Sequence, residues 1–180
     1  MSEITIRTAA PEDAAAILDI YRYYIQKTAI TFEITVPSAA EFQARITAIL
    51  KQYPYLVSIR NNTIVGYAYA REFVGREAYN HSVELTIYLS PAEKGRGTGR
   101  KLYAALEQKL AAQGILNLYA CIADPPVEDE YLNHNSENFH AHLGFTKVGT
   151  FHKCGRKFNR WYNMIWMEKL LGPHPDSPLH

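Results

Sequence analysis

The sequence predicts a single α/β domain with a central twisted sheet of mixed direction and about six to seven strands. Segments of strand and helical periodicity follow one another in the order β-α-α-β-β-β-α-β-α-β-β. The segment 117–122 is short and almost continuously apolar, as is typical of a strand at a sheet centre. The 180 residues suffice for one domain with a substantial core, and no internal repeat is visible.

The first half of the chain is expected to form one strand, two helices and a hairpin. Pro11 suits the first turn of a helix, and the apolar residues after it return at helical spacing. Pro37 and Ser38 begin the second helix. The Asn61-Asn62 pair is a turn signal between two strand-like runs. The expected ranges are 3–7 for the strand, 11–25 and 37–50 for the helices, and 55–60 and 63–73 for the hairpin.

The second half is expected to alternate strands and helices and to close with a strand pair. Gly114 and Gly144 each follow a helical segment, where glycine commonly ends a helix, and Ser136 is suited to cap the shorter one. The expected ranges are 81–89, 117–122, 145–152 and 161–170 for strands, 97–113 and 136–143 for helices, and 124–132 for an irregular loop. The domain covers residues 1–171, and the proline-containing tail 172–180 is expected to be disordered.

A glycine-rich loop between the strand 81–89 and the following helix is the strongest functional signal. Lys94 to Lys101 read Lys-Gly-Arg-Gly-Thr-Gly-Arg-Lys. Glycine lets backbone N–H groups approach a phosphate, the bare N-terminus of a helix attracts an anion, and the cations add counter-charge. We therefore expect a pyrophosphate-binding loop, with a glycine turn that binds no ligand as the alternative.

The glycine spacing excludes two common nucleotide loops. The dinucleotide fingerprint is G-x-G-x-x-G, whereas Gly95, Gly97 and Gly99 form G-x-G-x-G in the middle of the chain. The Walker loop ends in Gly-Lys-Ser/Thr, but Gly99 is followed by Arg100. Neither dinucleotide-dependent hydride transfer nor nucleotide hydrolysis is predicted.

Glu84 is the candidate catalytic residue. It lies in the apolar run from Val83 to Leu89, and strand alternation places Glu84, Thr86 and Tyr88 on one face. A carboxylate partly withdrawn from water beside a phosphate loop suits a general base. An exposed glutamate at a sheet edge is the alternative.

The composition argues against several classes of binding partner. The formal net charge of +1 argues against binding along a nucleic-acid backbone. No stretch reaches transmembrane length and no signal peptide is recognisable, so we expect a cytoplasmic protein without membrane association. Cys121 and Cys154 lack a CxxC pattern and are interpreted as reduced thiols of the core. The histidine and cysteine spacings match no familiar ligand set, so no metal is expected.

Two blocks of the chain resemble the GNAT superfamily of acyl-CoA-dependent N-acetyltransferases. Lys94 to Gly99 resembles its motif A, Arg/Gln-x-x-Gly-x-Gly/Ala, with Lys94 in place of the usual Arg or Gln. Asn133 to Phe145 resembles its second motif, an Asn followed by a helix that ends in Leu-Gly-Phe.

Three further blocks narrow the resemblance to the phosphinothricin/methionine-sulfoximine acetyltransferase branch. They are the segments 28–33, 83–84 and 155–161. The resemblance runs from about Ile4 to Leu171, and the segment 124–131 departs from it because it is several residues longer than the usual loop.

The resemblance implies a GNAT fold, with helices on both faces of the sheet, and acetyl-CoA as co-substrate. It also implies that strand backbone groups hold the pantetheine arm, and that an N–H near Tyr88 stabilises the developing oxyanion. The implied cofactor-binding residues are Ile87, Tyr88, Leu89, Lys94, Gly95, Arg96, Gly97, Thr98, Gly99, Arg100, Asn133 and Ser136.

The resemblance further implies how the acceptor amine is held. Glu84 would take its proton, and His140 stands where many members carry a general acid, a helix-face histidine being the alternative. Arg76 or Arg71 would bind an amino acid carboxylate, a surface ion pair being the alternative for either. The implied acceptor-binding residues are Val74, Gly75, Arg76, Glu84, Leu85 and Thr86.

The predicted function is therefore acetylation of the primary amine of a small molecule. Amino acid analogues of the phosphinothricin and methionine sulfoximine or sulfone type are the expected acceptors, and the family leads us to expect a homodimer. Two alternatives stay open: acetylation of a peptide or protein amine, and a non-catalytic acyl-CoA-binding module. The aromatics from Trp161 to Trp166 are interpreted as core or dimer contacts.

Overall fold

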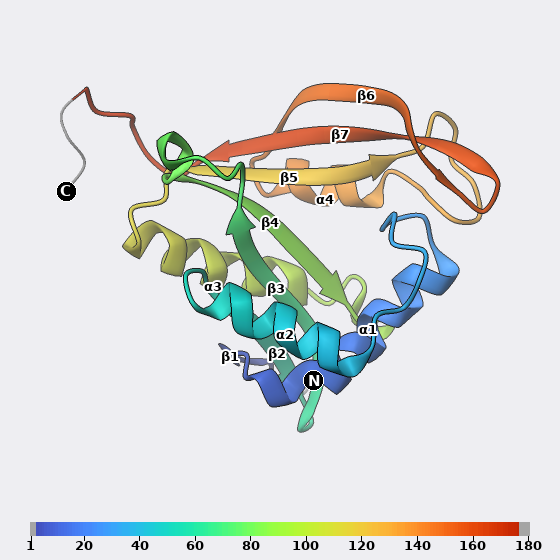
Figure 1. The fold of residues 1–180 in the computed structure, drawn as a ribbon, viewed down its shortest axis with the longest axis horizontal. Coiled ribbons are helices and arrows are strands. Elements are labelled where there is room, and N and C mark those ends of the chain that lie inside the picture. The colour runs from blue at the N-terminus through green and yellow to red at the C-terminus, as the bar shows by residue number, and fades with distance from the viewer. Residues whose placement is uncertain (1–2, 177–180) are drawn as a thin grey trace.

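A seven-stranded sheet runs through the molecule in the order β1-β2-β3-β4-β5-β7-β6 (Figure 1). The computed structural model describes residues 3–176. The β4–β5 pair is parallel and all other neighbours are antiparallel, so the predicted mixed sheet is confirmed. The strands are β1 (Thr5–Thr8), β2 (Tyr55–Arg60), β3 (Thr63–Glu72), β4 (Ser82–Leu89), β5 (Asn117–Asp124), β6 (Thr146–Lys157) and β7 (Arg160–Leu170).

Helices cover both faces of the sheet, as predicted. Because side chains alternate along a strand, Tyr55 and Val57 of β2 join the core beneath α1 and α2, while Leu56 joins the core beneath α3. Phe139 of α4 packs against the α3 core. The helices are α1 (Ala14–Lys27), α2 (Ala39–Leu50), α3 (Thr98–Ala112) and α4 (Asn135–His142), with short 3-10 turns η1 (Pro11–Asp13), η2 (Glu77–Tyr79) and η3 (Pro91–Glu93).

The sheet opens between its two central strands. β4 pairs with β5 only from Ser82↔Asn117 to Leu85↔Ala120. Beyond these pairs the two strands separate, as Figure 1 shows. The second half of β4 therefore keeps β3 as its neighbour on one side, and on the other side no strand of the described part of the chain pairs with it. This gap positions the site described below.

The closing hairpin of β6 and β7 is longer than predicted. β6 was expected to end at residue 152 but continues to Lys157, and the tight turn is formed by Phe158 and Asn159 with φ of 49° and 61°. An irregularity interrupts the register between Phe151 and Gly155. The bulged segment does not alternate polar and apolar residues, so pairing with β7, rather than sequence periodicity, extends this strand.

Some predicted boundaries are also corrected. Helix α4 begins at Asn135 after His134 and has no side-chain cap, so the expectation that Ser136 caps it is wrong. β5 runs two residues further than predicted, to Asp124. Residues 172–176 form neither helix nor strand, and His174 is hydrogen-bonded to Asn117. The rest of the tail expected to be disordered, residues 177–180, lies outside the described residues.

Within the described residues, no helix is both long and apolar enough to span a membrane.

Candidate active site

A cavity of about 820 Å³ lies where β4 and β5 separate. Strand alternation turns Glu84, Thr86 and Tyr88 toward it, and Cys121 of β5 and His140 of α4 line another part of its wall. The segment 30–33 and a group of tyrosines complete the wall. The cavity thus brings together the predicted base, the predicted acid and several predicted cofactor-binding strand residues.

Glu84 is 8% exposed and paired with an arginine from the neighbouring strand. Arg71 stands directly opposite Glu84 in the β3–β4 register, and its Nη2 donates to Oε1 of Glu84 at 2.6 Å. The alternative interpretation of an exposed glutamate at a sheet edge is therefore wrong. The Arg71 side chain remains 55% exposed, so its guanidinium is also accessible to a ligand.

The second half of β4 offers backbone groups to a ligand. Ile87 and Tyr88 line the cavity and have no β5 partner, which suits an extended pantetheine arm added like a strand. Leu89 is more restricted, because the Tyr24 hydroxyl donates to its carbonyl oxygen at 2.6 Å.

The glycine loop has the backbone geometry that a phosphate cradle needs. Gly95 and Gly97 have φ of 75° and 76°, a left-handed conformation that favours glycine. Gly97 precedes α3 without a side-chain cap, which leaves the N–H groups of the first turn available to an anion. A Cβ built at either glycine would meet no protein atom within 4 Å, so the cradle is open. The residues fit a pyrophosphate with cationic neighbours at Lys94, Arg96 and Arg100.

At two positions of the loop, Thr98 and Gly99, packing within the fold rather than contact with a ligand explains the residue type. Thr98 is buried, and its hydroxyl donates to Glu93 at 2.6 Å, so only its backbone can face a phosphate. A Cβ at Gly99 would lie 3.0 Å from the Phe139 ring and 3.3 Å from Leu89. Gly99 therefore allows α3 to approach α4 and β4 closely.

A buried ion pair that no local sequence pattern indicates lies beneath the loop. Glu93 is 3% exposed and accepts hydrogen bonds from Nε and Nη2 of Arg60, both at 3.0 Å. The Arg60 guanidinium lowers the pKa of Glu93, so the carboxylate stays charged and holds Thr98 at the helix start. Because Arg60 lies on β2, only the folded sheet brings these partners together.

His140 is held in one tautomer at the cavity wall. Its Nδ1 donates to the Ser136 carbonyl at 2.8 Å, so Nε2 accepts from the Tyr103 hydroxyl at 2.9 Å. Burial lowers the pKa of His140 to about 4. The imidazole is therefore neutral near neutral pH, and its Nε2 carries no proton to donate.

This burial predicts a pH-dependent stability. The unfolded imidazole takes up a proton near pH 6.5, whereas His140 in the folded protein does so only near pH 4. The unfolded state binds more protons between these values, so stability falls as pH drops through this window. From about pH 7 to pH 5 we expect wild type to lose about 2 kcal/mol more than His140→Gln in urea unfolding. Parallel pH curves for the two proteins would contradict the neutral, buried state of His140.

Four other predicted site residues lie away from the cavity wall. Asn133 is exposed, and its Oδ1 accepts from the Asn135 N–H at 3.1 Å. Val74, Gly75 and Arg76 are exposed in the connection between β3 and β4 and do not line the cavity. Their roles toward cofactor and acceptor stay predictions.

The tip of the β6–β7 hairpin packs against residues of the cavity wall. No local sequence pattern indicates this contact. A Cβ at Gly155 would collide with the ring of Phe32, a wall residue. Lys157 is 6% exposed, and its ammonium group donates to the carbonyl of Thr31 at 2.7 Å. Burial lowers the pKa of Lys157 to about 8. Two of the segments that suggested the narrower resemblance, 28–33 and 155–161, are thus one packing unit.

Comparison with known proteins decides the family. A model described as an acetyltransferase (GNAT) domain matches residues 6–166. The chain belongs to the GNAT acetyltransferase family. As a GNAT enzyme it is an acetyl-CoA-dependent N-acetyltransferase. The binding of the pantetheine arm by the open β4 edge and of the pyrophosphate by the glycine loop stays a prediction.

Individual GNAT relatives match over nearly the whole chain. The phosphinothricin N-acetyltransferase of Streptomyces coelicolor is 34% identical over 94% of this chain and 98% of its own. The L-methionine sulfoximine/L-methionine sulfone acetyltransferase of Salmonella typhimurium is 33% identical over 97% and 99%. A crystal structure of a GNAT phosphinothricin acetyltransferase from Sinorhizobium meliloti with acetyl-CoA has a TM-score of 0.87 and 34% identity, over 96% of this chain and 90% of that one.

Proposed function

We propose that this enzyme acetylates the primary amine of a small amino acid analogue, with Glu84 as the general base. The observation that carries the proposal is the Arg71–Glu84 ion pair, 2.6 Å long, in the wall of the cavity where the sheet opens. An amino acid presents a carboxylate and an amine on the same carbon. A neighbouring guanidinium and carboxylate are complementary to those two groups.

Arg71 is the better supported of the two candidate arginines. It lines the cavity and touches Glu84, whereas Arg76 is exposed outside the cavity wall. In the proposal, the acceptor's carboxylate binds Arg71 and thereby places its amine beside Glu84. The names of the two curated relatives, phosphinothricin N-acetyltransferase and L-methionine sulfoximine/L-methionine sulfone acetyltransferase, supply the first acceptors to test.

The reaction requires the loss of two protons from the nitrogen and one bond exchange. Glu84 removes a proton from the acceptor's ammonium group, directly or through water, and the neutral nitrogen attacks the acetyl carbonyl carbon. The C–N bond forms, the C–S bond breaks, and coenzyme A leaves as the thiolate. The second proton of the nitrogen passes to this thiolate or to water as the neutral amide forms. The backbone N–H near Tyr88 stabilises the developing oxyanion.

His140 is given a positioning role in this scheme. The neutral imidazole accepts a hydrogen bond from Tyr103, which also lines the cavity, so it orients that hydroxyl. We propose this role in place of proton donation by His140 itself, and the thiolate leaves readily without an acid.

An acceptor screen with free-thiol detection tests the proposal. Phosphinothricin, methionine sulfoximine, methionine sulfone, simple alkylamines and short peptides are compared. Arg71→Gln is expected to raise KM for amino acid acceptors by about tenfold or more, because a charge-assisted hydrogen bond is lost. Arg76→Gln is the matched control, and its KM should stay near that of wild type.

The screen separates the remaining alternatives. An alkylamine without a carboxylate makes no contact with the guanidinium. Its KM should therefore be the same with wild type and with Arg71→Gln. Turnover with peptides and none with any amino acid analogue would favour a protein acetyltransferase. Acetyl-CoA binding without turnover on any amine would favour a non-catalytic module.

We also propose that the enzyme is a homodimer that pairs through the β6–β7 surface. β6 lies at the edge of the sheet and most of its residues are exposed. Phe151 and Trp161 are 55% and 54% exposed on this hairpin, and a second chain would cover them. A monomeric mass in light scattering at micromolar concentration would contradict this assembly.

A further inference from the structure

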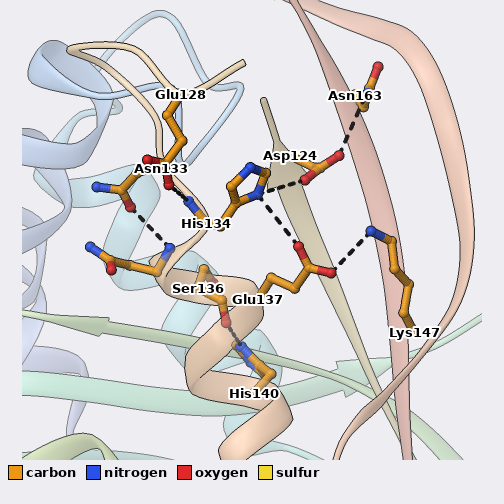
Figure 2. Close-up of polar contacts among 10 residues, drawn as sticks. Asp124, Glu128, Asn133, His134, Ser136, Glu137, His140, Lys147 and Asn163 are labelled. Carbon is orange, nitrogen blue, oxygen red and sulfur yellow. Dashed lines mark hydrogen bonds and ion pairs between the residues drawn. The ribbon is translucent and has the colours of Figure 1, made fainter. Parts of the chain in front are cut away.

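Three metal-ligating side chains converge outside the active-site cavity. Asp124 is the last residue of β5, His134 immediately precedes α4, and Glu137 lies in the first turn of α4. Figure 2 shows their side chains pointing toward one another across the entry to the helix. One ligand atom from each residue lies within 4.8 Å of the other two.

The two distances from His134 match those between ligands of a small divalent ion. Nδ1 of His134 lies 3.2 Å from Oδ1 of Asp124 and 3.6 Å from Oε2 of Glu137. Nitrogen and oxygen ligands bind zinc at about 2.0–2.2 Å, so in a tetrahedral site they lie about 3.3–3.6 Å apart. His134 therefore already stands at ligand spacing from both carboxylates, whose oxygens lie within 4.8 Å of each other.

The imidazole nitrogen Nδ1 of His134 is buried and has no hydrogen-bond partner among residues 3–176. Nδ1 of His134 has almost no solvent exposure, and neither carboxylate meets the geometry of a hydrogen bond to it. A buried polar atom without a partner is costly, and a metal ion between the three groups would satisfy it. Asp124 is itself 8% exposed and is oriented by the side-chain amide of Asn163 at 3.4 Å. Such outer contacts fix ligands in metal sites.

We propose that Asp124, His134 and Glu137 form a structural site for a divalent transition ion of the zinc class. One imidazole and two carboxylates favour zinc over magnesium or calcium, which prefer oxygen ligands alone. Water supplies the fourth position. Asp124 and His134 flank the segment 125–133, so the ion ties the two ends of the loop that is longer than usual in the family.

The site also adjoins the active-site wall. Ala123 and Ser136, the immediate neighbours of Asp124 and Glu137 in sequence, line the cavity, whereas the three ligands do not. A bound ion therefore holds the end of β5 and the start of α4 in place without entering the cavity.

Lys147 competes with the ion for one ligand. Its ammonium group lies 3.0 Å from Oε1 of Glu137 (Figure 2). Removing this charge leaves Glu137 free to turn fully toward the ion. Lys147→Met is therefore expected to tighten zinc binding, a result that a general folding defect would not produce.

Zinc titration of metal-free full-length protein tests the site, by calorimetry and by thermal unfolding. Wild type should bind one zinc ion per chain and gain roughly 5 °C in Tm at about a hundredfold excess over Kd. His134→Gln and Glu137→Gln should weaken binding by at least about tenfold. His142→Gln is the matched control, because His142 lies on the same helix and is exposed outside the cluster. It should bind zinc as wild type does.

Several results would overturn the proposal. One is the absence of saturable one-to-one binding by wild type, with native far-UV circular dichroism. Another is a zinc affinity that His142→Gln weakens as much as the ligand variants do. A third is unchanged zinc affinity in both His134→Gln and Glu137→Gln. Either result would place zinc elsewhere. Equal binding of magnesium or calcium under the same conditions would overturn the assignment to a transition ion.

Discussion

Glu84→Gln is expected to lower turnover by about a hundredfold or more, since a positioned general base contributes roughly 10²–10⁴ in rate. Glutamine has the same shape and its side-chain oxygen can still accept the Arg71 hydrogen bond, so the cavity should keep its form. Acetyl-CoA affinity should stay close to the wild-type value, because the expected cofactor contacts lie on the second half of β4 and in the glycine loop. Steady-state kinetics with an accepted amine, together with acetyl-CoA titration, measure both quantities.

The matched control removes another ion-paired carboxylate. Glu107 is paired with Lys169 at 2.8 Å and lies outside the cavity wall. Glu107→Gln loses an ion pair, as Glu84→Gln does, but should retain turnover near that of wild type. Wild-type turnover in Glu84→Gln would remove Glu84 from the role of base and leave it a partner of Arg71 alone.

Gly97→Val is expected to weaken acetyl-CoA binding by about tenfold or more. The substitution places a branched side chain in the open cradle at the start of α3, where the pyrophosphate would lie. It also forces a β-branched residue to φ near 76°, a strain of about 1–3 kcal/mol. Isothermal titration with acetyl-CoA and urea unfolding measure the two effects separately.

Gly114→Val separates steric exclusion from backbone strain. Gly114 follows the other end of α3 with φ of 79°, and a Cβ there also meets no atom within 4 Å. Both variants should therefore lose similar stability, whereas only Gly97→Val should lose affinity. Equal acetyl-CoA affinity in the two variants would mean that the loop does not hold the pyrophosphate.

The elements predicted from sequence were those specified by local pattern. Helical periodicity and terminal glycines located α3 to within about one residue at each end, because each residue's environment there follows from its neighbours along the chain. Alternation along β4 assigns Glu84 and Tyr88 to one face, and both line the cavity. The opening of the sheet also exposes Ile87 of the other face to it. The predicted range of β6 is too short because its bulged segment has no such alternation.

The sequence alone could not predict the roles of the arginines and histidines. Arg71 and Arg76 are equally charged neighbours in the chain, and only strand pairing placed Arg71 opposite Glu84. Its position in the sequence predicts His140 as a candidate acid, whereas the Ser136 carbonyl sets its tautomer and burial lowers its pKa. The histidine and cysteine spacings predict no metal. The Asp124–His134–Glu137 cluster, whose metal binding is our proposal, brings Asp124 to His134 only across a folded loop.

The sequence by itself determined the α/β order of elements, the G-x-G-x-G loop at the start of a helix, the carboxylate within β4 and the GNAT resemblance. All of these depend on residues close together in the chain, where backbone conformation and periodicity act. The tertiary structure decided the opening between β4 and β5, the Arg60–Glu93 support under the loop and the Asp124–His134–Glu137 cluster. These features join residues from separate elements, and their partners are set by which strands pair and which side chains lose water when the core forms.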